Sequence, residues 1–406
     1  MQFDEEFYNW IENHKDEDAN KLRLKYLSSK NCKPWITIAI SHIEARKKGE
    51  SKFINNNVSL LPKILFPSIA VEQASSVNTA IVHAEVMERL HGISELKVLD
   101  LTFGLGIDSH AFAEKGFEVT GIEIDKTKYE IALENYKNVR NLKIINEDCL
   151  EYLKNCDGTD IVFIDPGRRD KAGDRVFDIT QCSPNLHEVI KLIKGKARYL
   201  VAKVSPMLDI KHALLEIPEI SEVFVIGSKG ECKELLLVVD LNMTVRTDIE
   251  EIPIRLVIED LNYFFTFNYN QENAIKDLIQ FAFPQVNNYL YIPLAPVQKC
   301  GCFNLLAYKF KISAISNSSH VYIGRELIND FPGKCYRVQE IIPWKSANIK
   351  ILKKRKIQAD IIVKNFPFDI KFISSKLGIK PDSSTHLVAT TSADGIQYLL
   401  LCSKIY

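Results

Sequence analysis

Between residues 98 and 123, the apolar positions follow two different patterns, short continuous runs and a helical spacing. Two short apolar runs, at 98–99 and 119–122, each end in an acidic residue, Asp100 and Glu123. Between them lie a glycine-containing loop and a stretch whose apolar positions, 111–113, suit one face of a helix. The order of strand, loop, helix and strand predicts a βαβ unit. In such units the ligand lies at the carboxyl ends of the strands.

The same apolar pattern continues beyond this unit and predicts a larger sheet. Further strands are expected at 142–145, 160–164 and 199–204, followed by an antiparallel pair at 222–226 and 234–240 joined across 227–230. Strands that alternate with helical segments are typical of a parallel sheet. The antiparallel pair at the end of the predicted sheet distinguishes it from the sheet of a plain dehydrogenase.

The flanking regions have their own patterns, and the chain length suits two to four domains. Residues 1–93 carry apolar residues at helical spacing, and the last predicted helix leads into the first strand. Ser75 and Ser76 at its start either cap that helix or reach the ligand site, and both interpretations stay open. Short strands and helices predict two small α+β domains after the sheet. The expected division is 1–93, 94–243, 244–334 and 335–406.

The glycine loop has the chemistry of a nucleoside site. Gly104 and Gly106 allow the backbone to approach a ligand closely. The following helix directs free N–H groups to the same place. Glu123 stands 17 residues after Gly106, at the tip of the next strand, where a carboxylate can accept both hydroxyls of a ribose. No GKS or GKT sequence follows the loop, so a nucleotide-triphosphate loop is not supported.

Four motifs resemble a class I S-adenosylmethionine (SAM) dependent methyltransferase: DLTFGLG at 100–106, GIEID at 121–125, NEDCLEYL at 146–153 and VFIDPGRR at 162–169. RNA methylases of the trimethylguanosine-synthase type are the most similar, and they often replace the first loop glycine, as Thr102 does here. The resemblance implies a Rossmann-like seven-stranded α/β sheet with SAM as cofactor. It implies these cofactor-binding residues: Thr102, Gly104 and Gly106 at the methionine end, Glu123 at the ribose, Asp148 with Cys149 at the adenine, and Asp100 as a further residue of the site.

Asp148 also has a purely structural interpretation, as the N-cap of a helix over 149–153. The two roles are compatible, and both are retained.

The resemblance also implies a catalytic turn at 165–169, because Asp165 and Pro166 would border the methyl-transfer point. Enzymes that methylate exocyclic amines carry Asp or Asn, two prolines and an aromatic residue here, whereas this chain has Gly167 and Arg168. The turn therefore departs from the pattern of enzymes that methylate base amines, and the target atom stays open. Arg168 is expected either to grip a phosphate or stack on a base, or to pair with nearby acids.

A cysteine nucleophile is not expected. The loop after the fifth strand, 205–207, contains no cysteine, and Cys182 lacks the base or positive field that a thiolate nucleophile needs. Direct transfer to the acceptor is expected instead, with Asp165 as the group that takes a proton.

The C-terminal tail contains the local basic run of the chain. Seven Lys or Arg residues and one acid lie from Lys345 to Lys364, in a chain with 52 Lys or Arg and 52 Asp or Glu in total. Such a run is either a solvated face or a phosphate-binding surface. The tail resembles a THUMP-type domain, which implies RNA as partner.

Composition excludes several other classes. Nine cysteines without a CxxC pair predict neither a metal site nor a disulfide framework, and reduced thiols favour the cytoplasm. No apolar run is long enough to span a membrane. The predicted function is a SAM-dependent methyltransferase acting on RNA. The alternatives are a non-catalytic RNA-binding protein with the same fold, and a methyltransferase of protein or small molecules. The oligomeric state stays open.

Overall fold

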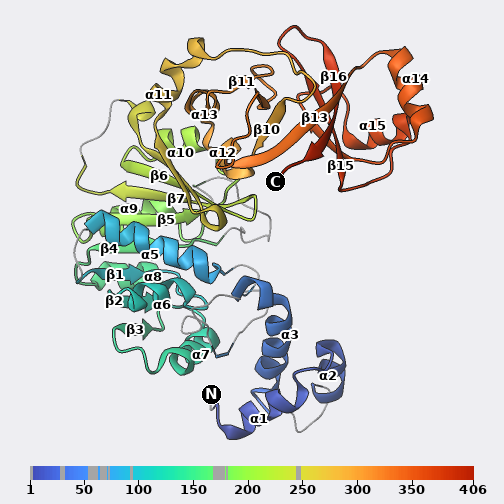
Figure 1. The fold of residues 1–406 in the computed structure, drawn as a ribbon. Coiled ribbons are helices and arrows are strands. Elements are labelled where there is room, and N and C mark those ends of the chain that lie inside the picture. Colours follow the sequence, from blue (N-terminus) through green and yellow to red (C-terminus); the bar gives the residue numbers. More distant parts are fainter. Residues whose placement is uncertain are drawn as a thin grey trace. The chain divides into compact units, whose positions relative to one another are not determined.

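A computed structural model describes residues 3–27, 33–53, 63–64, 71, 74–91, 95–167, 179, 182–243 and 248–406. The chain forms two compact units, each made of two segments: 1–221 with 235–247, and 222–234 with 248–406. Figure 1 shows the first unit from blue to green and most of the second from yellow to red. The chain therefore enters the second unit briefly, returns to the first, and then enters the second again.

The first unit is built on a sheet with strand order β3-β2-β1-β4-β5-β7. The strands are β1 (Lys97–Asp100), β2 (Glu118–Ile122), β3 (Leu142–Ile145), β4 (Ile161–Ile164), β5 (Tyr199–Val204) and β7 (Glu231–Asp240). The first five are parallel, and β7 runs antiparallel to β5. The start of β6 (Ile220–Ser228) lies beside the end of β7, where the Ser221 hydroxyl donates to the Val238 carbonyl over 3.1 Å. The predicted α/β fold class is confirmed.

The strand order reverses between β1 and β4, because β2 and β3 follow on one side and β5 on the other. Ligands of open α/β sheets bind at such a reversal, outside the carboxyl ends of the strands.

Short polar residues start most of the helices that follow the strands. The helices are α6 (Ile107–Glu114), α7 (Lys126–Tyr136), α8 (Cys149–Asn155), α9 (Leu186–Ile193) and α10 (Ile210–Glu216). Asp125, Asp148, Asn185 and Asp209 cap α7, α8, α9 and α10 through their side chains. Asx residues at this position satisfy free helix N–H groups, which fixes the loops at the carboxyl edge of the sheet.

The predicted helix before the first strand is α5 (Val77–His91), and it packs against α6. Val77 and Ala80 share a buried cluster with Ile107 and Ala111. The Ser76 hydroxyl accepts the Thr79 N–H over 3.1 Å, so the capping interpretation is confirmed for Ser76.

The N-terminal helices form an aromatic cluster that reaches α7. They are α1 (Glu5–His14), α2 (Ala19–Tyr26) and α3 (Ile36–Phe53). Phe7 and Trp35 are buried at the centre, with their ring centroids 5.6 Å apart. Ile131 of α7 belongs to the same cluster, and the Tyr8 hydroxyl donates to Glu134 over 3.1 Å.

The second unit holds a seven-stranded sheet with order β11-β12-β10-β13-β16-β15-β14. Its strands are β10 (Tyr289–Pro293), β11 (Ser313–Ala314), β12 (Tyr322–Gly324), β13 (Gly333–Pro343), β14 (Asp360–Lys364), β15 (Thr385–Thr391) and β16 (Gln397–Lys404). β10 pairs along its length with β13. One sheet therefore continues across residues 334 and 335, where the sequence analysis places a domain boundary.

Two further strands continue the sheet from β6, and the other remaining elements of the second unit are helices and turns. They are β8 (Ile254–Ile258), β9 (Tyr263–Phe267), α11 (Tyr269–Ala274), α12 (Ala295–Cys300), α13 (Phe303–Phe310), α14 (Ser346–Arg355), α15 (Ile370–Leu377) and three 3₁₀ turns, Ile249–Glu251, Glu259–Leu261 and Lys276–Leu278. β6 pairs in parallel with β8, and β8 pairs antiparallel with β9.

The connection between β6 and β7 is shorter than predicted. Gly227 and Ser228 belong to β6, and a two-residue turn remains at Lys229 and Gly230. Both turn residues have positive φ, 52° and 80°. This geometry suits the tight hairpin turn whose twist matches that of the strands.

No helix in the described ranges is long and apolar enough to cross a membrane.

Candidate active site

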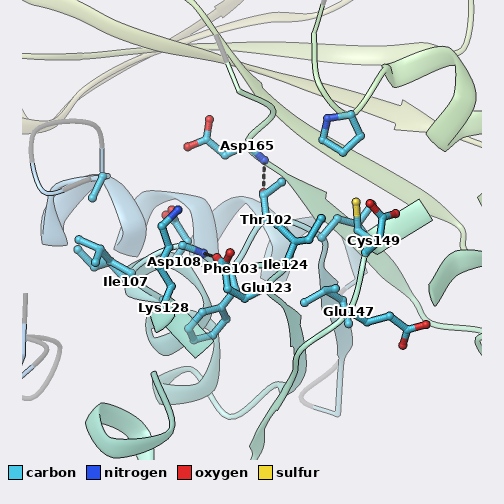
Figure 2. A pocket seen from close by; sticks show the side chains of 18 of the residues that line it. Thr102, Phe103, Ile107, Asp108, Glu123, Ile124, Lys128, Glu147, Cys149 and Asp165 are labelled. Atoms are coloured by element: carbon cyan, nitrogen blue, oxygen red, sulfur yellow. Dashed lines mark hydrogen bonds between the residues drawn. The ribbon is translucent and has the colours of Figure 1, made fainter. Parts of the chain in front are cut away.

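A cavity of about 390 Å³ lies where β1, β2 and β4 end (Figure 2). Its size is in the range of small-molecule sites. Seven of the predicted site residues line it: Thr102, Gly104, Gly106, Glu123, Asp148, Cys149 and Asp165. Asp100 and Pro166 are buried outside its wall. Arg168 lies outside the described residues.

Asp100 stabilises the glycine loop from its buried side. Its side chain is buried, and its two oxygens accept the Thr102 N–H over 2.9 Å and the Ser109 hydroxyl over 2.6 Å. Burial raises the pKa of this carboxyl to about 7, although the two hydrogen bonds act against the rise. Asp100 therefore holds the first turn of the loop against the start of α6.

The loop requires glycine at its second glycine position. Gly106 has a φ of 75°, and a Cβ there would lie 2.3 Å from the Phe103 ring and 2.6 Å from the Tyr136 ring. Gly104 has a φ of 58°, but a Cβ there would meet the Thr102 carbonyl at an ordinary 3.7 Å. Both glycines therefore supply a left-handed backbone, and Gly106 also permits close packing.

Glu123 ties the end of β2 to the glycine loop. Its Oε2 accepts the Gly104 N–H over 2.9 Å, and its Oε1 accepts the Asp125 N–H over 2.8 Å. The residue is 6 % exposed and lines the cavity. Each carboxylate oxygen has two lone pairs, so these bonds leave acceptor capacity for a ligand hydroxyl.

Asp148 and Cys149 form the wall at the end of β3. Asp148 caps α8 by accepting the Leu150 and Glu151 N–H groups over 2.9 and 3.2 Å, as its structural interpretation predicts. It lines the cavity at the same time, so the two predicted roles are compatible. Burial, and then the nearby Asp148 charge, raises the pKa of the Cys149 thiol to about 11. Cys149 therefore carries a neutral thiol near pH 7.

Asp165 stands at the end of β4 and lines the cavity, and it is labelled in Figure 2. Its backbone N–H donates to the Thr102 hydroxyl oxygen over 2.7 Å, which is the dashed line in Figure 2. Its side chain is 26 % exposed, and its Oδ2 accepts the Lys203 ammonium over 2.6 Å. The following turn is held by the Gly167 N–H, which donates to the Ser183 carbonyl over 2.8 Å.

Sequence reasoning missed a buried polar chain behind Asp165. Lys203 Nζ also donates to Ser75 Oγ over 2.9 Å, and Ser75 donates to Asp108 Oδ2 over 2.7 Å. Asp108 Oδ1 lies 2.8 Å from His83 Nδ1. One available signal was Lys203 itself, the single charged residue in the apolar run YLVAKV. The site interpretation of Ser75 was correct in part, because Ser75 lines the cavity.

Among the residues that the structure describes, no group of three or more His, Cys, Asp or Glu side chains is placed to hold a metal ion.

Three family models match separate parts of the chain. Residues 73–156 match the tellurite resistance protein TehB, residues 289–332 match a ferredoxin-like domain, and residues 333–404 match a THUMP-like domain. No curated protein matches the chain.

Solved structures extend the comparison to the whole length. A protein of Porphyromonas gingivalis designated a candidate methyltransferase is 26 % identical, with a TM-score of 0.81 and complete coverage of both chains. The chain is a class I SAM-dependent methyltransferase.

Two further matches to this methyltransferase are partial. A candidate RNA methyltransferase of Pyrococcus horikoshii is 14 % identical over 48 % of this chain and 97 % of its own, with a TM-score of 0.32. A SAM-dependent methyltransferase of Agrobacterium tumefaciens is 21 % identical over 40 % of this chain and 62 % of its own, also with a TM-score of 0.32.

SAM is the cofactor of the methyltransferase, and the chemistry of the cavity fits it. The glycine loop leaves backbone close to the cavity, Glu123 offers carboxylate lone pairs, and Ile124 supplies an apolar surface that is 68 % exposed. These features suit, in turn, an amino-acid end, a ribose and a base.

Proposed function

We propose that this methyltransferase transfers a methyl group directly from SAM to an N–H or O–H group of RNA. The observation that carries the proposal is the position of Asp165: its carboxylate lines the cavity at the end of β4, next to the glycine loop. The THUMP-like match at 333–404 supports RNA as the acceptor.

The cofactor end is assigned to the residues around the glycine loop. Thr102, Gly104 and Gly106 would hold the methionine end of SAM, and Glu123 would accept the ribose hydroxyls. Asp148 and the Cys149 backbone would meet the adenine. Asp100 would act from beneath, because its contacts with Thr102 and Ser109 shape the loop.

At the acceptor end, Asp165 would receive the hydrogen bond of the reacting N–H or O–H group. Bound SAM supplies a methyl group on a sulfonium, which is a strong electrophile. Asp165 would align the acceptor and take its proton as the new bond to carbon forms and the carbon–sulfur bond breaks. Pro166 would fix the turn behind Asp165. Arg168, which lies outside the described residues, would contact a phosphate or a base.

The cysteines support direct transfer rather than a covalent enzyme intermediate. Of the cysteines in the described ranges, Cys149 alone lines the cavity. Its raised pKa keeps it a thiol, whereas the nucleophile of such a mechanism is a thiolate.

The basic run supplies fewer free charges than its sequence indicates. Arg355 makes two hydrogen bonds of 2.8 Å to Glu340, and Lys364 is half-buried, where it donates to Gln298 over 3.0 Å. Burial also lowers the pKa of Lys364. We therefore assign the phosphate contacts to the exposed lysines at the end of α14, Lys353, Lys354 and Lys356.

The four-part division at 93, 243 and 334 and the cytoplasmic location remain predictions that accompany this proposal. Its experimental test is label transfer from methyl-tritiated SAM into separate pools of total RNA, DNA, protein and small molecules. We expect label in RNA, and labelling at least about 100-fold slower with the Asp165→Asn variant.

Label in protein or small molecules, with RNA unlabelled, would contradict RNA as the acceptor. Binding of RNA without any label would favour the alternative of a non-catalytic RNA-binding protein. A fully active Asp165→Asn variant would remove Asp165 from the reaction.

A further inference from the structure

Asp165, Lys203, Ser75, Asp108 and His83 form a continuous chain of polar contacts beside the cavity. We propose that Lys203 is a positioning residue for methyl transfer, which fixes the Asp165 carboxylate through a buried link that continues over Ser75 to Asp108 and His83. The inference rests on the proposed role of Asp165 and assigns a function to a residue that does not line the cavity.

The geometry of Lys203 leaves its ammonium little freedom. The residue lies in β5, next to β4 in the sheet, and its side chain is 2 % exposed. Its Nζ contacts Asp165 Oδ2 at 2.6 Å and Ser75 Oγ at 2.9 Å. Two short contacts from one buried ammonium hold the Asp165 side chain in a single orientation.

The energetic balance argues against a role in stability alone. Removing an ammonium from water costs several kcal/mol, and an ion pair in the interior returns this cost only with good geometry and further hydrogen bonds. Apolar residues of similar size often serve stability equally well. β5 is otherwise apolar and buried. Stability alone therefore does not explain a lysine at this position, whereas holding Asp165 does.

The direction of the hydrogen bonds can be followed through the chain. An ammonium has donors and no acceptor, so Ser75 Oγ accepts from Lys203 and donates to Asp108 Oδ2. Burial alone would raise the pKa of Asp108, but His83, Lys203 and Ser75 lower it to about 2. Asp108 is therefore a carboxylate at neutral pH and a fixed acceptor. Ser75 lies just before the start of α5, and His83 lies within it. This helix therefore holds the end of the chain of contacts that is far from Asp165.

In the part of the chain that the structure describes, Asp165 Oδ1 accepts no hydrogen bond, so this oxygen is left for the acceptor. Lys203 occupies Oδ2, and the Asp165 backbone is fixed by its hydrogen bond to Thr102 in the glycine loop. Oδ1 can then accept an N–H or O–H group from one defined direction. Losing the ammonium would free the carboxylate to rotate without removing any residue of the cofactor end.

The experiment is a double-mutant cycle of four proteins: wild type, Lys203→Met, Asp165→Asn, and the double variant. Each is measured for single-turnover methyl transfer at saturating SAM into the pool that accepts label, for SAM affinity by calorimetry, and for Tm. Lys191→Met, an exposed lysine on α9, is the matched control. The double variant removes both charges of the Lys203–Asp165 pair, so it keeps the cycle interpretable if Lys203→Met folds poorly.

We expect Lys203→Met to slow transfer about tenfold or more while SAM affinity stays within about threefold, because positioning acts on the chemical step. In the Asp165→Asn background the same substitution should cost less than about twofold, since residues that act as a unit are not additive. The Lys191→Met control should match wild type.

Equal losses in both backgrounds, or no loss at all, would overturn the inference while Asp165 kept its role. A parallel loss of SAM affinity would likewise overturn it and make Lys203 structural. If Asp165→Asn transfers methyl groups at the wild-type rate, the proposed role of Asp165 fails instead. Label in a pool other than RNA contradicts the RNA proposal and leaves the cycle fully measurable.

Discussion

The two ends of the cavity are stabilised by different kinds of contact. At the end that we assign to the cofactor, carboxylates accept backbone N–H groups, Asp100 from Thr102 and Glu123 from Gly104 and Asp125, and Asp100 also accepts the Ser109 hydroxyl. At the end that we assign to the acceptor, the contacts of the Asp165 carboxylate and the Lys203 ammonium run from side chain to side chain. Contacts at the cofactor end therefore depend mainly on the course of the backbone. Contacts at the acceptor end depend on side chains, which single substitutions can change.

Sequence separation follows the same division. Asp100 and Thr102 are 2 positions apart and Glu123 and Gly104 are 19 apart. Lys203 lies 38 positions from Asp165 and 128 from Ser75. Local contacts leave a readable motif, and distant ones do not.

The largest effect is expected for Glu123→Ala. The change removes a carboxylate that would accept ribose hydroxyls and also leaves the Gly104 N–H without its acceptor. Hydrogen bonds to charged groups contribute about 1.5–3 kcal/mol each, so SAM should bind about 100-fold more weakly by calorimetry.

Glu118→Ala, at the exposed start of the same strand, is the control and should bind as wild type. If Glu123→Ala binds SAM as tightly as wild type, the assignment of Glu123 to the ribose is wrong.

Gly106→Ala should be more harmful than Gly104→Ala. Both add a Cβ at positive φ, which costs about 1–2 kcal/mol, but only at Gly106 would the Cβ clash with the Phe103 and Tyr136 rings. We expect a clearly lower Tm and at least about tenfold weaker SAM binding for Gly106→Ala. Equal Tm values for the two variants would show that the loop is not closely packed.

Asp100 predicts a pH dependence with a definite sign. Because burial raises its pKa to about 7, the folded state binds more protons than the unfolded state between about pH 4 and pH 7. Wild-type stability should therefore lose this contribution as the pH rises through that window. Asp100→Asn lacks the titration, so its Tm relative to wild type should increase from pH 4 to pH 7 and stay level above. A constant difference would indicate that Asp100 does not titrate there.

The smallest effect is expected in the second unit. Lys353→Gln with Lys354→Gln removes two exposed charges from α14, which should weaken RNA binding severalfold and reduce the salt dependence by about one to two phosphate contacts. The control pair is Lys21→Gln with Lys25→Gln on α2. A loss that ignores salt concentration would argue against phosphate contact.

Much of the fold could be predicted from the sequence, because apolar runs, glycines and capping residues are local signals. The strands around Asp100, Glu123 and Asp165 were correctly expected, and so was the cap at Asp148. Turn length was less accessible, because Gly227 and Ser228 extend β6 although glycine and serine are typical of loops.

The acceptor end could be predicted only in part. Asp165 follows an apolar run and was identified, but nothing in the sequence joins Lys203 to Ser75, Asp108 or His83. Charge state was equally hidden: Lys364 is one of a basic run in sequence, yet it is half-buried and bonded to Gln298. Such contacts depend on how distant elements pack.

In the proposed mechanism, the cavity separates cofactor binding from acceptor positioning. SAM calorimetry combined with single-turnover methyl transfer in the Asp165→Asn variant tests this separation directly. We expect a SAM affinity within about twofold of wild type and a transfer rate at least about 100-fold lower, as expected for loss of an interaction made in the transition state. Weakened SAM binding together with an unchanged rate at saturation would contradict it, because Asp165 would then belong to the cofactor end.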